Sequence, residues 1–292
     1  MKIGVIHWAF PPVIGGVETH LLTILPEMSR QGEEIFLLTS TVEGLPETEE
    51  RDGITIIRKD GMLLKNLAEW TKEGRELRHQ AEDMFRGFIE KNGIEVIKAH
   101  NLHLGYSLYS EVLVHVCKEK GVPSYLVLHN DFLEWKDNPE YADKEKEMWK
   151  ILELDWDCIV SISEYIKRSL IQRRPAVKEK HWEVILHGID LEKFHPVSPE
   201  RREELREQYG FTGRKVIFHP ARMGGGGDGK GIISTIKIMP QVVKEFPDAL
   251  LVLSGGKSKL VGEEITVPKL SYEEELIKSL GIERNVPVSY TH

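Results

Sequence analysis

Short apolar runs alternate with helical patterns along most of the 292-residue chain. Between the runs, apolar residues recur at helical spacing, as in VETHLLTILPEMSRQG, which follows the first run. The runs typical of buried strands are IGVIHW, EIFLLTS, ITIIR, EVIKAH, SYLVLH, DCIVSIS and WEVIL. Strands that alternate with helices favour an α/β fold with a mostly parallel sheet.

A charged linker separates this first series of elements from a second, shorter one. We place the first domain at residues 1–196 and the second domain at residues 197–292. Ser198 and Pro199 predict the N-terminus of an exposed helix in the linker. The pattern that follows contains about half of an ordinary α/β domain, so we expect the second domain to be incomplete.

The composition is that of a soluble globular protein, with 40% hydrophobic and 29% charged residues. The 39 basic and 47 acidic residues give a formal charge of −8, which disfavours nucleic acid as a main partner. The sequence has no apolar run of spanning length and no signal peptide pattern. We therefore expect a cytoplasmic protein. Weak association with the inner membrane surface, through a charged helix predicted over residues 65–91 or through the segment QRRPAVKEK, is the alternative.

Two cysteines, Cys117 and Cys158, occur in apolar segments without the spacing of metal ligands. They are predicted to be buried thiols rather than a disulfide. This use of cysteine is typical of a reducing compartment.

A glycine-rich loop is the first candidate for a ligand site. Five of the six residues from Gly224 to Gly229 are glycine, between Arg222 and the Lys230-Gly231 pair that opens the next helix. Glycines let backbone N–H groups approach a phosphate, the helix N-terminus adds a partial positive charge, and the two cations add full charges. The pattern predicts a cradle for a diphosphate, and the alternative is an ordinary surface loop.

A second glycine pair, Gly15 and Gly16, joins the first strand to the first helix. These glycines can present N–H groups to a phosphate or a sugar, or they can form a tight turn. The sequence has no G-x-G-x-x-G fingerprint directly after the strand, which disfavours an NAD-dependent enzyme.

Several polar residues lie near predicted strand ends. His129 follows SYLVL and is expected at the carboxyl edge of the sheet, either in a ligand site or as a structural histidine. His100 and His103 lie near another strand end, but no further residue has the spacing of a metal ligand, so we expect no metal there. Glu164 is expected either to favour the start of a helix or to orient a sugar.

Further motifs occur in a fixed order from residue 1 to about residue 290. They are HNLHLGYSL, VLHND, SISEYIKRSL, HGIDLEKFHP, the loop with Arg222 and Lys230, and FPDALLVLSGG. Together they resemble the retaining, nucleotide-sugar-dependent glycosyltransferases of family 4, also called glycosyl transferases group 1. The resemblance implies the GT-B fold, in which two Rossmann-like α/β domains face a cleft.

The same resemblance implies roles for particular residues. His129 would position the transferred sugar, and the Gly15-Gly16 pair would lie beside the donor diphosphate or the acceptor. Arg222, Lys230 and Gly231 would hold the diphosphate of a nucleoside diphosphate sugar. Two fixed cations can stabilise the charge that develops on the leaving phosphate, so no metal or other cofactor is expected. His129, Arg222 and Lys230 are therefore the candidate catalytic residues.

Three features depart from the family pattern. His187 stands where the family usually has asparagine before Gly-Ile-Asp. Seven residues separate Arg222 from Lys230, where four are usual, so the loop is longer and richer in glycine. The family's later acidic motif, two glutamates separated by seven residues, belongs to a part of the second domain that we expect the chain not to reach. Glu273, Glu274 and Glu275 lie too early to replace it.

We therefore predict a glycosyltransferase that moves a sugar from a nucleoside diphosphate sugar to an acceptor hydroxyl with retention of configuration. The acceptor would be a carbohydrate or a lipid-linked molecule, bound by a complete first domain. Two alternatives remain: a non-catalytic sugar- or protein-binding subunit, and a sugar-nucleotide isomerase of the same architecture.

Overall fold

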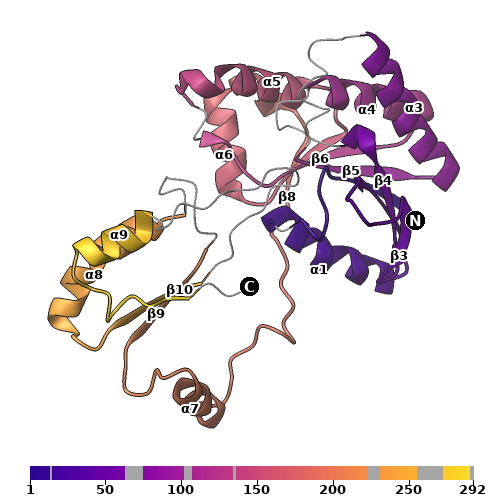
Figure 1. Ribbon diagram of the computed structural model, residues 1–292. Helices are drawn as coiled ribbons and strands as arrows, with labels where there is room; N and C mark the ends of the chain where they lie inside the picture. Colours follow the sequence, from indigo (N-terminus) through magenta and orange to yellow (C-terminus); the bar gives the residue numbers. More distant parts are fainter. Residues whose placement is uncertain are drawn as a thin grey trace. The chain divides into compact units, whose positions relative to one another are not determined.

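The computed structural model describes residues 1–13, 15–62, 75–101, 107–133, 136–221, 230–254 and 272–289 (Figure 1). The chain divides into two compact units, Met1–Asp190 and Leu191–His292. The predicted domain boundary at residue 196 falls in a segment, residues 185–200, in which every residue is exposed.

The first unit is built on an eight-stranded sheet with the strand order β3-β4-β2-β1-β5-β6-β7-β8. Every neighbouring pair is parallel except β3 with β4, which confirms the predicted α/β fold with a mostly parallel sheet. The strands are β1 (Lys2–Ile6), β2 (Glu34–Ser40), β3 (Thr48–Arg51), β4 (Ile54–Lys59), β5 (Val96–His100), β6 (Ser124–Leu128), β7 (Cys158–Ser161) and β8 (Trp182–Val184).

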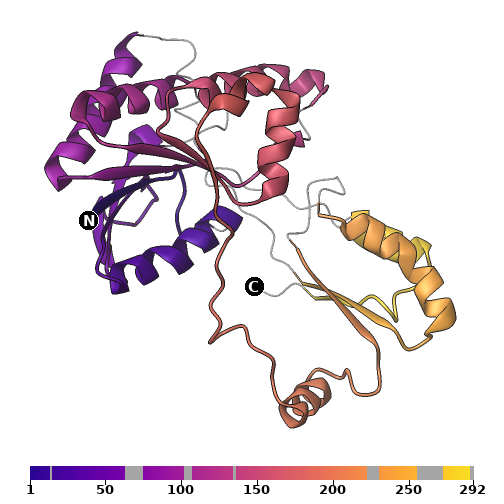
Figure 2. The ribbon, with the colours of Figure 1, turned by 180° about the vertical axis from the view of Figure 1, so that it is seen from behind.

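Helices cover both faces of this sheet (Figures 1 and 2). One face packs against α3 (Arg75–Asn92), α4 (Ser107–Lys120), α5 (Ala142–Glu153) and α6 (Glu164–Arg173) in one continuous apolar core. The opposite face packs against α1 (Gly16–Arg30) through Leu21 and Leu25. Short 3-10 turns occupy Asp60–Met62, Pro139–Tyr141 and Pro175–Glu179. No helix in the described ranges has both the length and the apolar character needed to cross a membrane.

The edge strand β3 is not predicted from the sequence, because its residues TEER include no apolar side chain that marks a strand. The strand is held by Arg58 of β4, whose side chain is buried. Arg58 Nη2 donates to Glu49 Oε2 at 2.7 Å, and Nη1 donates to the carbonyl oxygen of Pro46 at 3.0 Å. A short polar edge of this kind also discourages pairing with the sheet of another molecule.

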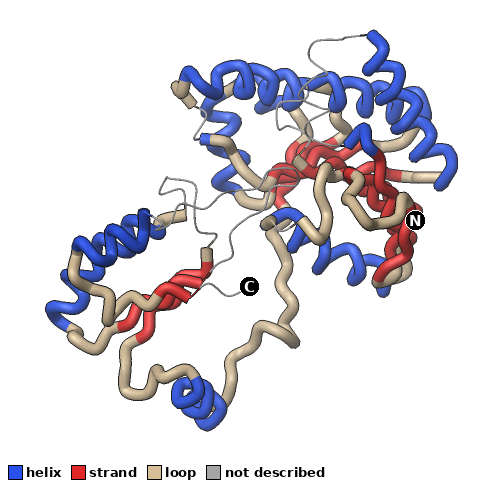
Figure 3. Tube along the Cα trace, viewed as in Figure 1, coloured by secondary structure: helices blue, strands red, loops and turns tan. Residues whose placement is uncertain are grey.

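The second unit contains a parallel three-stranded sheet with the order β11-β10-β9 (Figure 3). Its strands are β9 (Val216–Pro220), β10 (Leu250–Ser254) and β11 (Val288–Ser289). The apolar faces of α8 (Ile232–Glu245) and α9 (Tyr272–Ser279) form its core, with Ile236, Met239 and Ile277 buried. The helix predicted in the linker is α7 (Pro199–Gln208), and Ser198 Oγ accepts a hydrogen bond from Arg201 N at 3.2 Å, which confirms the predicted cap.

Both cysteines are buried free thiols, as predicted. Burial raises the pKa of Cys117 to about 12, and it also raises the pKa of Cys158. Because the thiolate is the reactive form, neither side chain is a nucleophile at neutral pH.

Candidate functional site

The order of the strands in the first unit reverses between β1 and β5. From β1 the sheet continues through β2 and β4 on one side, and from β5 it continues through β6, β7 and β8 on the other. Open parallel sheets bind ligands outside the carboxyl ends of the strands at such a reversal. His7 directly follows β1, His100 ends β5 and His129 directly follows β6. This carboxyl edge is therefore the candidate site.

Five histidines meet there, and we call them the histidine cluster: His7, His20, His100, His129 and His187. His129 lies in the middle, with its Nε2 2.9 Å from His100 Nδ1 and its Nδ1 3.0 Å from His187 Nε2. His20 of α1 stacks on His187, with ring centroids 4.0 Å apart and an interplanar angle of 15°. Each N···N contact holds one proton, so a neutral His129 donates to one neighbour and accepts from the other.

A buried carboxylate joins the histidine cluster from the first turn of α1. Glu18 Oε1 lies 3.1 Å from His7 Nε2, and His7 Nδ1 lies 3.0 Å from the carbonyl oxygen of His100. A carbonyl only accepts, so His7 Nδ1 carries a proton and donates it. A second proton must then lie between His7 Nε2 and Glu18, because two lone pairs would otherwise face each other. The pair therefore links α1 to β1 and β5 by a shared proton.

Burial keeps several rings of the histidine cluster neutral. Burial, followed by the charges of His187 and Lys98, lowers the pKa of His20 to about 4. Burial also lowers the pKa of His100 well below its usual range, followed by the effect of neighbouring His129. The pKa of His187 is lowered by burial as well. The charge of Lys98 in β5 also lowers the pKa of His100, and burial lowers the pKa of Lys98 itself.

The free energy of unfolding is expected to fall as the pH drops from about 6.5 to about 4. Unfolded His20 takes up a proton near 6.5, whereas folded His20 takes it up at about 4, so the unfolded state binds more protons in this window. Urea unfolding at pH 7.0, 5.5 and 4.5 checks this slope. A His20→Gln variant is expected to flatten the slope, and His79→Gln, at an exposed position of α3, is the control. An unchanged slope in His20→Gln would contradict the role of His20.

Three buried polar atoms at the same edge have no hydrogen-bond partner among the described residues. They are Trp8 Nε1, His100 Nε2 and Asn101 Oδ1. A buried polar atom without a partner costs roughly 1–3 kcal/mol, so these atoms favour a bound group that can donate and accept, as a hydroxyl does. In the described part of the chain no group of three or more His, Cys, Asp or Glu residues could hold a metal ion.

The two predicted glycines of the first unit have different surroundings. Gly15 precedes α1, and a Cβ there would lie 2.0 Å from Glu18 Oε2, so a side chain at this position would displace the carboxylate that pairs with His7. At Gly16 a Cβ would meet no described atom within 4 Å. The packing of the protein therefore explains a glycine at position 15, but it does not explain one at position 16.

The candidate residues of the second unit are described in part. Lys230 is exposed, and its carbonyl oxygen accepts a hydrogen bond from His219 Nε2 at 3.0 Å. Gly231 has φ 73° at the N-terminus of α8, a left-handed conformation that favours glycine. Arg222 and the glycines of the loop lie outside the described residues, as does His103.

Sequence patterns missed part of the histidine cluster. His7 stood inside a predicted strand, and Glu18 and His20 stood inside a predicted helix without a motif of their own. Glu164 is the first residue of α6 and is exposed, as expected for a residue that favours a helix N-terminus. The signal for the cluster was the placement of several histidines at the ends of neighbouring parallel strands, which requires the strand order.

A family model for Glycosyltransferase Family 4 matches residues 14–193, which include Glu18, His20, His100, His129 and His187. The chain belongs to Glycosyltransferase Family 4. One similar relative of this family 4 chain is the putative glycosyltransferase YtcC of Bacillus subtilis (strain 168), 28% identical over 198 residues. Another is mannosylfructose-phosphate synthase of Agrobacterium fabrum, 26% identical over 307 residues. The matches cover 64% and 96% of this chain but 44% and 63% of the relatives.

Solved structures of similar fold include sucrose-phosphate synthase of Thermosynechococcus elongatus, with a TM-score of 0.71 and 16% identity. That match covers 100% of the family 4 chain and 70% of the synthase. HepE of Anabaena, solved in complex with UDP, has a TM-score of 0.64 and 18% identity, with 100% of this chain and 70% of HepE covered. These similarities confirm the predicted GT-B fold.

Proposed function

We propose that this family 4 chain acts in the transfer of a sugar from a nucleoside diphosphate sugar to an acceptor hydroxyl, with retention of configuration. The observation that carries the proposal is the histidine cluster at the strand-order reversal, inside the segment that the family model matches. The bound UDP of HepE supports a nucleoside diphosphate as the leaving group. Relatives that are named synthases of sugar phosphates and of a glucosyl lipid support carbohydrate or lipid-linked acceptors. We place the reaction in the cytoplasm.

His129 positions the transferred sugar in this proposal. His187, which bonds His129 Nδ1, lies in an exposed segment, so a sugar hydroxyl can take its place without disturbing the sheet. The Trp8 indole N–H and Asn101 Oδ1 supply a donor and an acceptor for further hydroxyls. When a sugar hydroxyl replaces His187 at His129 Nδ1, the number of hydrogen bonds is kept and the sugar is held in one orientation.

The chemistry at the diphosphate needs no metal in this proposal. The bond from the anomeric carbon to the phosphate oxygen breaks, a bond to the acceptor oxygen forms on the same face, and the acceptor proton passes to the leaving phosphate. Arg222 and Lys230 stabilise the charge that grows on that phosphate, and Gly231 offers a backbone N–H group.

Calorimetric titration with UDP, GDP and ADP tests the diphosphate site. An Arg222→Ala/Lys230→Ala variant is expected to bind the preferred nucleotide about 10- to 100-fold more weakly, because it loses two charge-assisted contacts. The matched control is Lys237→Ala/Lys244→Ala, which removes two exposed cations from α8. Equal affinity of the wild-type chain and the Arg222/Lys230 variant for every nucleotide would contradict the assignment, and so would equal losses in both variants.

A further inference from the structure

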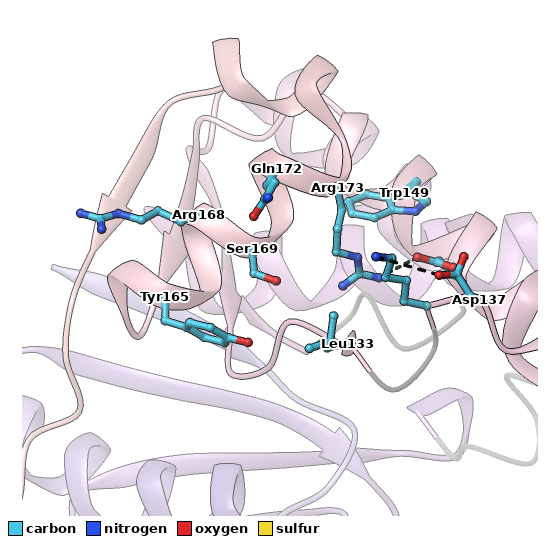
Figure 4. A pocket seen from close by; sticks show the side chains of 10 residues that line it. Leu133, Asp137, Trp149, Tyr165, Arg168, Ser169, Gln172 and Arg173 are labelled. Carbon is cyan, nitrogen blue, oxygen red and sulfur yellow. Dashed lines mark hydrogen bonds and ion pairs between the residues drawn. The ribbon is translucent and has the colours of Figure 1, made fainter.

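A pocket of about 840 Å³ lies in the first unit (Figure 4). It is formed by α6, by α5 and by the segment after β6, and the residues used below are Leu133, Lys136, Trp149, Tyr165, Arg168 and Arg173. Leu133 comes four residues after His129, so their Cα atoms lie at most about 14 Å apart along the chain. A short stretch of chain therefore joins the pocket to His129.

One wall of the pocket is built around Arg173. Its side chain is 9% exposed, Nη1 donates to the carbonyl oxygen of Asp131 at 2.6 Å, and Nη2 donates to Glu145 Oε1 at 2.6 Å. The guanidinium also lies over the Trp149 ring, 5.2 Å from its centroid. Arg173 Nε is buried and has no hydrogen-bond partner in the described ranges. Arg173 is therefore held in place by several contacts, while its Nε–H group has no described acceptor.

The same wall is tied to the segment that carries His129. Ser169 Oγ donates to Asp131 Oδ2 at 2.6 Å, so Asp131 receives hydrogen bonds from two residues of α6. Figure 4 shows Tyr165, Ser169 and Arg173 extending from α6 toward Leu133. A ligand that contacts α6 would therefore bind against a surface held in fixed relation to His129.

The pocket carries a surplus of positive charge in a protein whose formal charge is −8. The carboxylate of Glu145 is neutralised by Arg173 at 2.6 Å. Lys136 Nζ is 3.9 Å from Asp137 Oδ2, and Arg168 Nε is 3.6 Å from Glu164 Oε2. The side chains of both of these last two pairs are more than half exposed, and ion pairs between exposed side chains are weak. Lys136 and Arg168 can therefore turn toward an anion at little cost.

We propose that this pocket binds the phosphate group of a phosphorylated sugar, held by Lys136 and Arg168 with the Tyr165 hydroxyl, above the wall formed by Arg173. Arginine and lysine, which both line this pocket, suit a phosphate monoester because it accepts hydrogen bonds on three oxygens. The binding of a sugar phosphate is argued from the pocket alone. Its role as the acceptor rests on the proposed function.

Binding of hexose phosphates to the whole chain tests the proposal, by calorimetry and by ³¹P NMR line broadening. Glucose 6-phosphate and fructose 6-phosphate are compared with glucose and fructose, in the absence of any nucleotide. A Lys136→Gln/Arg168→Gln variant is expected to bind the preferred hexose phosphate at least about tenfold more weakly. Lys178→Gln/Arg202→Gln removes the same charge at exposed positions elsewhere and is expected to change affinity by less than about twofold. Equal thermal unfolding of the variants shows that both remain folded.

The outcomes separate this proposal from its rivals. Binding of a hexose phosphate but not of its hexose, weakened only by the pocket variant, supports it. It is overturned if no hexose phosphate binds, if hexose and hexose phosphate bind equally, or if both double variants lose affinity equally. Binding to phosphatidylglycerol vesicles but to no hexose phosphate would also overturn it, in favour of a lipid headgroup. The nucleotide titration contains no hexose phosphate, so failure of the diphosphate site and failure of this pocket are read independently.

Discussion

Replacement of His129 by alanine is expected to lower kcat/KM for sugar transfer by about 100-fold or more. His129 is the central ring of the histidine cluster, and its loss removes the contacts to both His100 and His187. A misplaced sugar loses the alignment on which transfer depends, and displacements of about 1 Å can cost about 100-fold in rate. Initial rates with a nucleotide sugar and its acceptor measure the effect.

The matched control is His181→Ala. His181 precedes β8 and contacts the carbonyl oxygen of Asp157, and its side chain is 63% exposed. It is expected to keep wild-type activity. If His129→Ala retained more than a tenth of the wild-type kcat/KM, a role for this ring in positioning the sugar would be wrong.

Replacement of Glu18 by alanine is expected to destabilise the first unit by about 3–5 kcal/mol. His7 and Glu18 are 1% and 5% exposed, and the proton they share leaves one member unpaired when the other is removed. Loss of one partner of a buried pair typically has this cost. Urea unfolding followed by tryptophan fluorescence measures it, because Trp8 is adjacent to His7 and their ring centroids are 5.7 Å apart.

A His7→Leu/Glu18→Leu variant provides the second arm of the same measurement. Removal of both polar groups leaves no unpaired partner, so the double variant is expected to lose less stability than His7→Leu and Glu18→Leu together. Additive losses would show that the two side chains do not share a proton. Activity is not needed for this test.

The parallel strands of the first unit could be predicted because each is a continuous apolar run, such as SYLVL, bounded by polar residues. The cap at Ser198 could be predicted because serine is a favoured N-cap and proline is favoured at the first position of a helix. The strand β3 could not be predicted, because its residues TEER are polar. Its position depends on a contact with Arg58, which lies in another strand. Local pattern was sufficient where local burial decides the structure, and it failed where a distant partner does.

The candidate site divides in the same way. His129 could be predicted from its place after a strand, and Gly15 from its place before a helix. Their partners His7, Glu18 and His187 are brought together by the order of the strands, which adjacent residues do not encode. The pocket on α6 was missed because Lys136, Arg168 and Arg173 look like ordinary surface charges in sequence, and only the structure shows that they surround one cavity.

One member of the histidine cluster, His187, lies on a segment that is weakly attached to the sheet. His187 follows β8, an edge strand of three residues that is paired on one side with β7. Short edge strands fray with a local free energy far below that of global unfolding. Release of this strand would withdraw His187 from His129, while β1, β5 and β6 stayed paired. Loss of His187 from the histidine cluster is therefore expected to need less free energy than unfolding of the first unit.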